Sequence, residues 1–215
     1  MTKSDSPLKP LYVPPRYQAL NDLVSSRVGQ LQAKHLANAR GVAGDFAALR
    51  RGVAAAPGSD PSIWRLTLEG LPDQYRGGDD RITAEEHAAH AALTLYATHQ
   101  QSQPTGVHQR GITLGRATSR LSKEAGEAGV IRRFHALGTA SSFTEVMHHA
   151  RGLISQLRQK KIQLDYGHLA VDLARLQHPE SAAAVRLAWG RDFTFPTRTN
   201  EQTESTDPTP NGDTE

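Results

Sequence analysis

Apolar residues recur at helical spacing along almost the whole chain. Between residues 16 and 39, leucine and valine fall three or four positions apart, as on one face of a helix. The same pattern predicts further helices over 42–52, from Asp60 through Leu68, and over 84–99, 114–121, 130–137, 143–157, 166–176 and 179–193. Sustained polar/apolar alternation is missing from the sequence, and no Asn-Gly pair lies between two hydrophobic runs as in a hairpin turn. The pattern therefore predicts an all-α fold of about eight to nine helices.

Several of these helices have recognisable start signals. Thr83-x-x-Glu86 and Ser142-x-x-Glu145 have the spacing of capping boxes, in which side chains at the N-cap and third position bond each other's backbone N–H groups. Asp60 precedes Pro61, a proline suited to the first helical position. Asp165 is predicted to cap the helix that follows it.

Gly, Pro and polar segments suggest how the chain is divided. Residues 1–15 contain four prolines, and residues 196–215 are polar and lack aromatic residues, so both segments are predicted to be disordered. The Gly/Pro/Gln-rich loop at 100–111 separates a predicted N-terminal helical lobe, 16–102, from a C-terminal helical lobe, 103–195.

The composition argues against an enzyme. The 215 residues include no cysteine, which excludes a thiol nucleophile, thiolate-bound zinc and an iron–sulfur cluster. No phosphate-binding, dinucleotide-binding, zinc-protease or serine-hydrolase motif occurs in the sequence. The acidic pairs Asp79-Asp80 and Glu85-Glu86 are explained by turn and cap chemistry. We therefore expect neither catalysis nor a cofactor.

The histidines do not form a recognisable metal site. His87 and His90 lie three apart on one predicted helical face, but no third ligand accompanies them, so we expect no bound metal. No run of eighteen apolar residues is present, and the N-terminus lacks the apolar centre of a signal peptide. These features predict a cytoplasmic protein without a membrane partner.

Charge is distributed unevenly along the chain. The formal net charge is +3, but residues 199–215 contain five acids and no Lys or Arg. Without that tail, the chain has 25 basic and 17 acidic residues, a net charge of +8. Between Arg110 and Lys161, ten basic residues accompany three acids. Arginine outnumbers lysine 19 to 6, and the guanidinium fork suits phosphate, so the balance favours a polyanionic partner.

The spacing of the basic residues places them on helix faces. Arg116, Arg120 and Lys123 are predicted to share one face, as are His148, Arg151 and Arg158 on a later helix. Aromatic residues make up only 6% of the chain, which argues against stacking of successive bases. Contacts to a nucleic-acid backbone fit the pattern better.

Five segments together resemble CasB, the small subunit of Cascade, the type I-E CRISPR surveillance complex. The resemblance extends over about residues 16–195. It is carried by Ala48-Leu49-Arg50-Arg51-Gly52, Gly111-Ile112-Thr113-Leu114-Gly115-Arg116-Ala117, Val130-Ile131-Arg132-Arg133-Phe134-His135-Ala136-Leu137, Leu164-Asp165-Tyr166 with Leu169 and Asp172-Leu173, and Trp189-Gly190-Arg191-Asp192-Phe193.

The resemblance implies a non-catalytic helical subunit, present as two copies among the other Cascade subunits. Its basic surface would contact guide RNA, target DNA and the displaced single strand, and so stabilise the R-loop in antiviral defence. It implies nucleic-acid contacts for Arg50, Arg51, Arg116, Arg132 and Arg133. The helical-face argument alone adds Arg110, Arg120, Lys123, Arg151 and Arg158.

Two other classes of protein remain as alternatives. A helix-turn-helix regulator would also be basic and helical, but no predicted helix begins with a clear set of base-reading Arg, Asn or Gln residues. A helical scaffold that binds only protein would tolerate charge reversal at Arg132 and Arg133.

Overall fold

The computed structural model describes residues 11–78 and 80–195, and within them the chain forms nine α-helices. The helices are α1 (Gln18–Leu36), α2 (Val42–Gly52), α3 (Trp64–Thr67), α4 (Ala84–Gln100), α5 (Leu114–Ala125), α6 (Glu127–Thr139), α7 (Phe143–Gln159), α8 (Tyr166–Leu176) and α9 (Pro179–Thr194). Three 3₁₀ turns accompany them: η1 (Pro15–Tyr17), η2 (Pro61–Ile63) and η3 (Asp73–Tyr75). The predicted all-α class is confirmed.

Most helix starts follow the predicted capping chemistry. Both hydrogen bonds of the capping box between Thr83 and Glu86 are present. At α7, Ser142 accepts the Glu145 N–H, but the Glu145 carboxylate accepts from the backbone N–H of Ser141 at 2.7 Å. The prediction of a complete second box is therefore wrong in its second bond. Asp165 caps α8 by accepting the His168 N–H, as predicted.

Two helices differ from their predicted extents. Helix α1 ends at Leu36 rather than near residue 39, because Asn38 adopts a left-handed backbone conformation with φ of 51° that a helix cannot continue. The helix predicted from Asp60 is divided into η2 and the single turn of α3, although Asp60 does cap it by accepting the Ser62 N–H.

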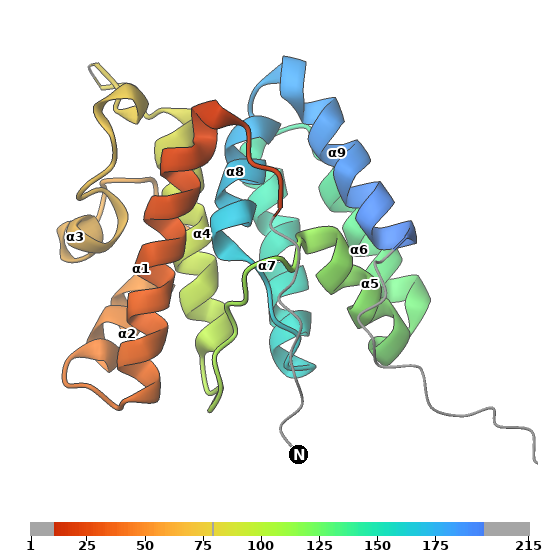
Figure 1. The fold of residues 1–215 in the computed structure, drawn as a ribbon, viewed down its shortest axis with the longest axis horizontal. Helices are drawn as coiled ribbons and strands as arrows, with labels where there is room; N and C mark the ends of the chain where they lie inside the picture. The colour runs from red at the N-terminus through yellow and green to blue at the C-terminus, as the bar shows by residue number, and fades with distance from the viewer. Residues whose placement is uncertain (1–10, 79, 196–215) are drawn as a thin grey trace, which may run out of the picture.

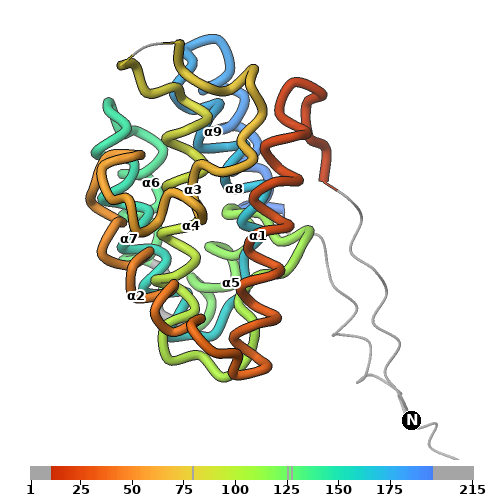
Figure 2. Tube along the Cα trace, turned by 90° about the vertical axis from the view of Figure 1, so that its left-hand side faces the viewer, coloured from red at the N-terminus to blue at the C-terminus, as the bar shows by residue number. Residues whose placement is uncertain are grey.

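Helices α4 and α8 form the centre of the molecule. Figure 1 shows α1, α2 and α3 on one side of this pair and α5, α6 and α9 on the other. Nearly all residues of α8 from Tyr166 to Ala174 are buried, as expected for a helix surrounded by others. Figure 2, turned by 90°, shows α7 and α1 on opposite flanks of α4. One hydrophobic core extends from Tyr17 to Trp189.

A short backbone pairing joins the segment before α5 to the segment before α8. Leu164 N–H donates to Val107 O at 3.0 Å, and Asp165 N–H donates to Ile112 O at 2.8 Å. The Asp165 carboxylate also accepts the Gly111 N–H at 2.9 Å. These bonds fix the loop before α5 against the N-terminus of α8.

Other predictions about organisation are tested less directly. The lobe boundary at 102/103 stays a prediction, and α8 packs against α1 and α4 as well as α9. The predicted disordered segments lie outside the described residues, except for residues 11–15. In the described ranges, no helix has the length and apolar character needed to cross a bilayer.

Candidate nucleic-acid interface

Arg50 and Arg51 lie at the C-terminal end of α2, where cations suit the helix dipole. Arg50 is half-buried and Arg51 is exposed. The next residue, Gly52, is buried, and its carbonyl accepts a hydrogen bond from His90 Nε2 at 2.9 Å. A Cβ at Gly52 would lie 2.7 Å from Ile63 Cδ1. Glycine therefore lets the end of α2 pack closely against Ile63 and His90.

Arg116 has a different environment from the other basic residues of α5. Its Nη1 donates to the Gly111 carbonyl at 3.0 Å, and its Nε lies 3.5 Å from the Asp192 carboxylate of α9. Only 23% of the side chain is exposed, whereas Arg120 and Lys123 lie at the surface. The predicted common face of Arg116, Arg120 and Lys123 is thus corrected: Arg116 turns inward, because Asp192 and the Gly111 carbonyl hold its guanidinium.

Arg116 belongs to a set of residues at the contact of α5 with α9, which we call the α5–α9 cluster: Thr113, Gly115, Arg116, Trp189 and Asp192. The Thr113 hydroxyl caps α5 and donates to Asp192 Oδ2 at 2.6 Å. A Cβ at Gly115 would lie 2.5 Å from the Trp189 carbonyl oxygen, so the two helices require glycine there. The Trp189 indole donates to the buried Asp172 carboxylate at 2.6 Å.

Arg132 and Arg133 are exposed on α6. The Arg133 guanidinium lies so close to Gly152 of α7 that a Cβ at Gly152 would overlap with Nη1. The absence of a side chain at Gly152 therefore lets the Arg133 side chain rest against α7. The residue before that glycine, Arg151, is exposed.

Arg158 and Arg110 make contacts within the protein. Arg158 Nη1 donates to Gln101 Oε1 at 2.9 Å, which joins the C-terminal part of α7 to the loop after α4. Arg110 is exposed and lies 4.0 Å from the Asp22 carboxylate of α1. An exposed pair at that distance contributes little to stability.

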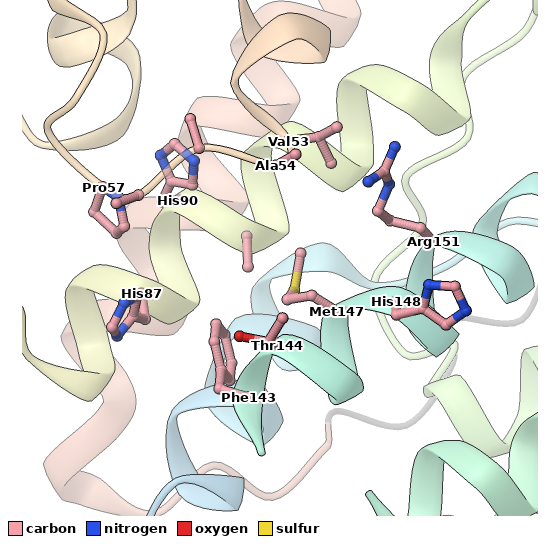
Figure 3. Close-up of a pocket in the computed structure, with 13 residues that line it drawn as sticks. Val53, Ala54, Pro57, His87, His90, Phe143, Thr144, Met147, His148 and Arg151 are labelled. Carbon is pink, nitrogen blue, oxygen red and sulfur yellow. The ribbon is translucent and has the colours of Figure 1, made fainter.

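A cavity of about 430 Å³, which we call the α2–α7 cavity, lies between the loop after α2, helix α4 and the N-terminal half of α7 (Figure 3). Its residues include apolar groups and basic or neutral polar groups, but no carboxylate. They are Val53, Ala54, Ala55, Ala56, Pro57, His87, His90, Ala91, Phe143, Thr144, Met147, His148 and Arg151. Arg50 and Arg51 directly precede the loop that forms one wall. The loop that follows this arginine pair and Arg151 of α7 thus line the same cavity.

Comparison with known protein families identifies the family of this chain. A family model described as CRISPR-associated protein Cse2 matches residues 45–193, more than half of the sequence. The chain belongs to the Cse2 family. The resemblance to CasB inferred from the sequence motifs is confirmed by a solved structure, CasB from Thermobifida fusca. That structure is 33% identical, with a TM-score of 0.69, and the match covers 82% of this chain and 98% of that one.

Two further solved structures share the fold. A CRISPR-associated protein of the Cse2 family from Thermus thermophilus is 25% identical, with a TM-score of 0.60 and coverage of 81% of this chain and 97% of that one. A chain described as belonging to a CRISPR RNA-guided surveillance complex is 23% identical, with a TM-score of 0.63 and coverage of 81% and 93%. No curated protein sequence matches the chain.

In this Cse2-family chain, two histidines of the cavity wall favour their neutral form. Burial lowers the pKa of His87 and that of His90, because a desolvated imidazole binds a proton less readily. Positive charge near neutral pH is therefore supplied mainly by the arginines. Among the described residues, no group of three or more His, Asp or Glu is arranged to hold a metal ion.

Sequence reasoning did not identify the α2–α7 cavity of this Cse2-family chain as a site. The sequence indicated surface or partly buried histidines at His87 and His90 rather than metal ligands, and it predicted that Phe143 and Met147 face the core. Both of the latter are half-buried, and the Phe143 ring lies 5.2 Å from the His87 ring. The spacing of apolar residues does not show that Phe143 and Met147 are only half-buried, because the cavity wall is formed by segments far apart in sequence.

Proposed function

We propose that this Cse2-family chain is a non-catalytic, nucleic-acid-binding small subunit of the type I-E CRISPR RNA-guided surveillance complex, Cascade. It contacts guide RNA, target DNA and the displaced strand through a basic surface, and these contacts stabilise the R-loop. Its partners are the other Cascade subunits and a second copy of itself. Family membership and the structural match to a surveillance-complex chain support the assignment.

The observation that carries the nucleic-acid role is a set of exposed basic side chains on α5, α6 and α7. Among the described side chains, no carboxylate lies within ion-pair distance of Lys123, Arg132, Arg133 or Arg151. Their charge is available to a polyanion. Arg51 and Arg120 add to the exposed basic surface, whereas Arg116 supports the fold.

Modest contacts are sufficient for this role. Formation of an R-loop exchanges one duplex for another of similar stability, so contacts to the backbone of the separated strands shift the balance toward the open state. Arginine contacts to phosphate are largely independent of base sequence. A subunit that holds whatever sequence the guide RNA has selected needs this kind of binding.

The salt dependence of binding to an unrelated single strand tests the proposal. We expect the double substitution Arg132→Glu and Arg133→Glu to weaken binding at least tenfold and to reduce the log–log salt slope by about 1 to 2. The matched control is Arg186→Glu with Arg191→Glu, which makes the same charge change at exposed positions of α9. Fluorescence anisotropy of labelled strands in a salt titration provides the measurement.

The outcomes separate the candidate functions. An equal loss of strand affinity in both double variants would show that binding depends only on the net charge of the protein. That result would contradict binding by a defined surface. Tight binding to one palindromic duplex would favour a helix-turn-helix regulator instead. Co-expression with the other Cascade subunits and a guide RNA should recover the chain in the ribonucleoprotein, and failure to co-purify would refute the subunit assignment.

A further inference from the structure

The α2–α7 cavity has an apolar and partly aromatic wall. Phe143 and Met147 of α7 are half-buried, and Ala91 of α4 is buried behind them. The rings of Phe143 and His87 are 5.2 Å apart at an interplanar angle of 40°. In Figure 3 these side chains surround one space together with Val53 and Pro57 from the loop after α2. Such a wall suits a flat, apolar-faced group.

The residues that line this cavity include an arginine and no carboxylate. Arg151 and His148 line the cavity and are exposed, and Arg51 lies two residues before Val53. No Asp or Glu is among the lining residues, although the carboxylate of Glu86 acts on His87 from outside the lining. The charge pattern favours a ligand that joins an anionic group to a flat apolar group.

One buried polar atom of the wall has no partner. His90 Nε2 donates to the Gly52 carbonyl, so in the neutral ring Nδ1 is an acceptor. This Nδ1 is buried and makes no hydrogen bond within the described part of the chain. An unsatisfied buried acceptor is costly. This atom has almost no accessible surface, so it lies behind the part of the wall that a ligand would contact.

We propose that the α2–α7 cavity binds one unstacked nucleobase of a single strand whose phosphates contact Arg151 and Arg51. This inference rests on the proposed function and assigns it a specific pocket. The volume of 430 Å³ lies within the range of roughly 300–1,000 Å³ that small-molecule sites have. Bases removed from a stack are held between aromatic and apolar side chains in this way.

The low aromatic content of the chain is compatible with this arrangement. It argues against a platform on which successive bases stack, since such a platform needs an aromatic residue for each base. One cavity holds one base, and neighbouring nucleotides are held by their phosphates. Binding would then depend on the presence of bases but little on their order.

A comparison of two strands with equal numbers of phosphates tests the proposal on the full chain. One strand has mixed bases, and the other consists of abasic residues. Ala54→Trp fills the cavity from an exposed loop position, and Ala183→Trp, exposed on α9, is the matched control. We expect Ala54→Trp to weaken binding of the normal strand about tenfold and to leave binding of the abasic strand unchanged. Phe143→Ala should likewise weaken binding of the normal strand and leave binding of the abasic strand unchanged.

Each outcome has a defined meaning. If Ala54→Trp changes neither strand, or weakens both equally, the base pocket is refuted while backbone binding stands. If the unmodified chain binds neither strand, the proposed function itself fails. If Ala54→Trp leaves strand binding intact but abolishes co-purification with the other Cascade subunits, the cavity accepts a protein side chain, and the base pocket is also refuted.

Discussion

The α5–α9 cluster and the α2–α7 cavity use the same kinds of residue for opposite purposes. In the cluster, Arg116 is mostly enclosed, with a carboxylate and a carbonyl as partners. At the cavity, Arg151 is exposed and no lining residue is acidic. The charge of Arg116 is paired with Asp192 inside the cluster, whereas the charge of Arg151 is exposed at the cavity and available to a ligand. An arginine in a family motif is therefore not by itself a sign of nucleic-acid contact.

The same contrast holds for the aromatic residues. Trp189 is buried, and its indole N–H is bonded to Asp172. Phe143 is half-buried and faces a cavity. The cluster therefore fixes the distance between α5 and α9, while the cavity presents an apolar wall to solvent. Substitution of a cluster residue should mainly lower the free energy of unfolding, whereas substitution of a cavity residue should mainly weaken nucleic-acid binding.

The largest expected effect is on the cluster. We expect Trp189→Ala to lower the free energy of unfolding by about 3–5 kcal/mol, because it creates a cavity and leaves the buried Asp172 carboxylate without its donor. Urea denaturation followed by circular dichroism measures the change. A loss below about 1 kcal/mol would show that the α5–α9 contact adds little to the fold.

The next largest effect should be a loss of folding stability at acid pH, caused by the buried side chain of His99. Burial lowers the pKa of His99 to about 4, and its Nδ1 lies 2.8 Å from the Tyr166 hydroxyl. Below the ordinary value of 6.5 the unfolded chain binds this proton while the folded chain does not, so stability falls between about pH 6.5 and pH 4. His99→Gln should make the stability–pH profile shallower over that window. An unchanged slope would contradict the assignment.

The smallest effects compare two arginines directly. We expect Arg116→Ala to cost about 1–2 kcal/mol of stability and to leave the salt slope of strand binding unchanged. Arg151→Ala should change stability by less than about 0.5 kcal/mol and reduce the slope by about 1. Denaturation and salt titration of both variants provide the measurement. The reverse result would remove the distinction between the two regions.

Local signals accounted for much of the fold. The spacing of apolar residues predicted the buried stripe of α7, and the hydroxyl or carboxylate at Thr83 and Asp165 predicted two helix starts, because capping depends on neighbours in sequence. The end of α1 was predicted too late, since no sequence rule required Asn38 to adopt a left-handed conformation.

From the sequence, the candidate site could be predicted only as a set of basic residues, without their contacts. The partner that turns Arg116 inward, Asp192, is 76 positions away in sequence. The cavity is formed by a loop, α4 and α7, which periodicity treats as separate elements. Helical spacing indicates which face of its helix a residue occupies. It does not indicate whether the neighbouring element places a carboxylate opposite that residue or leaves a cavity there.

The central place of α8 has a consequence for synthesis of the chain. Helices α1 and α4 are made early, yet they pack against a helix that begins at Tyr166. On the ribosome, the first half of the chain therefore emerges before its main packing surface exists. The fold is completed only after α8 and α9 have left the exit tunnel, and nascent chains that stop before Tyr166 expose the apolar faces of α1 and α4 to chaperones and proteases.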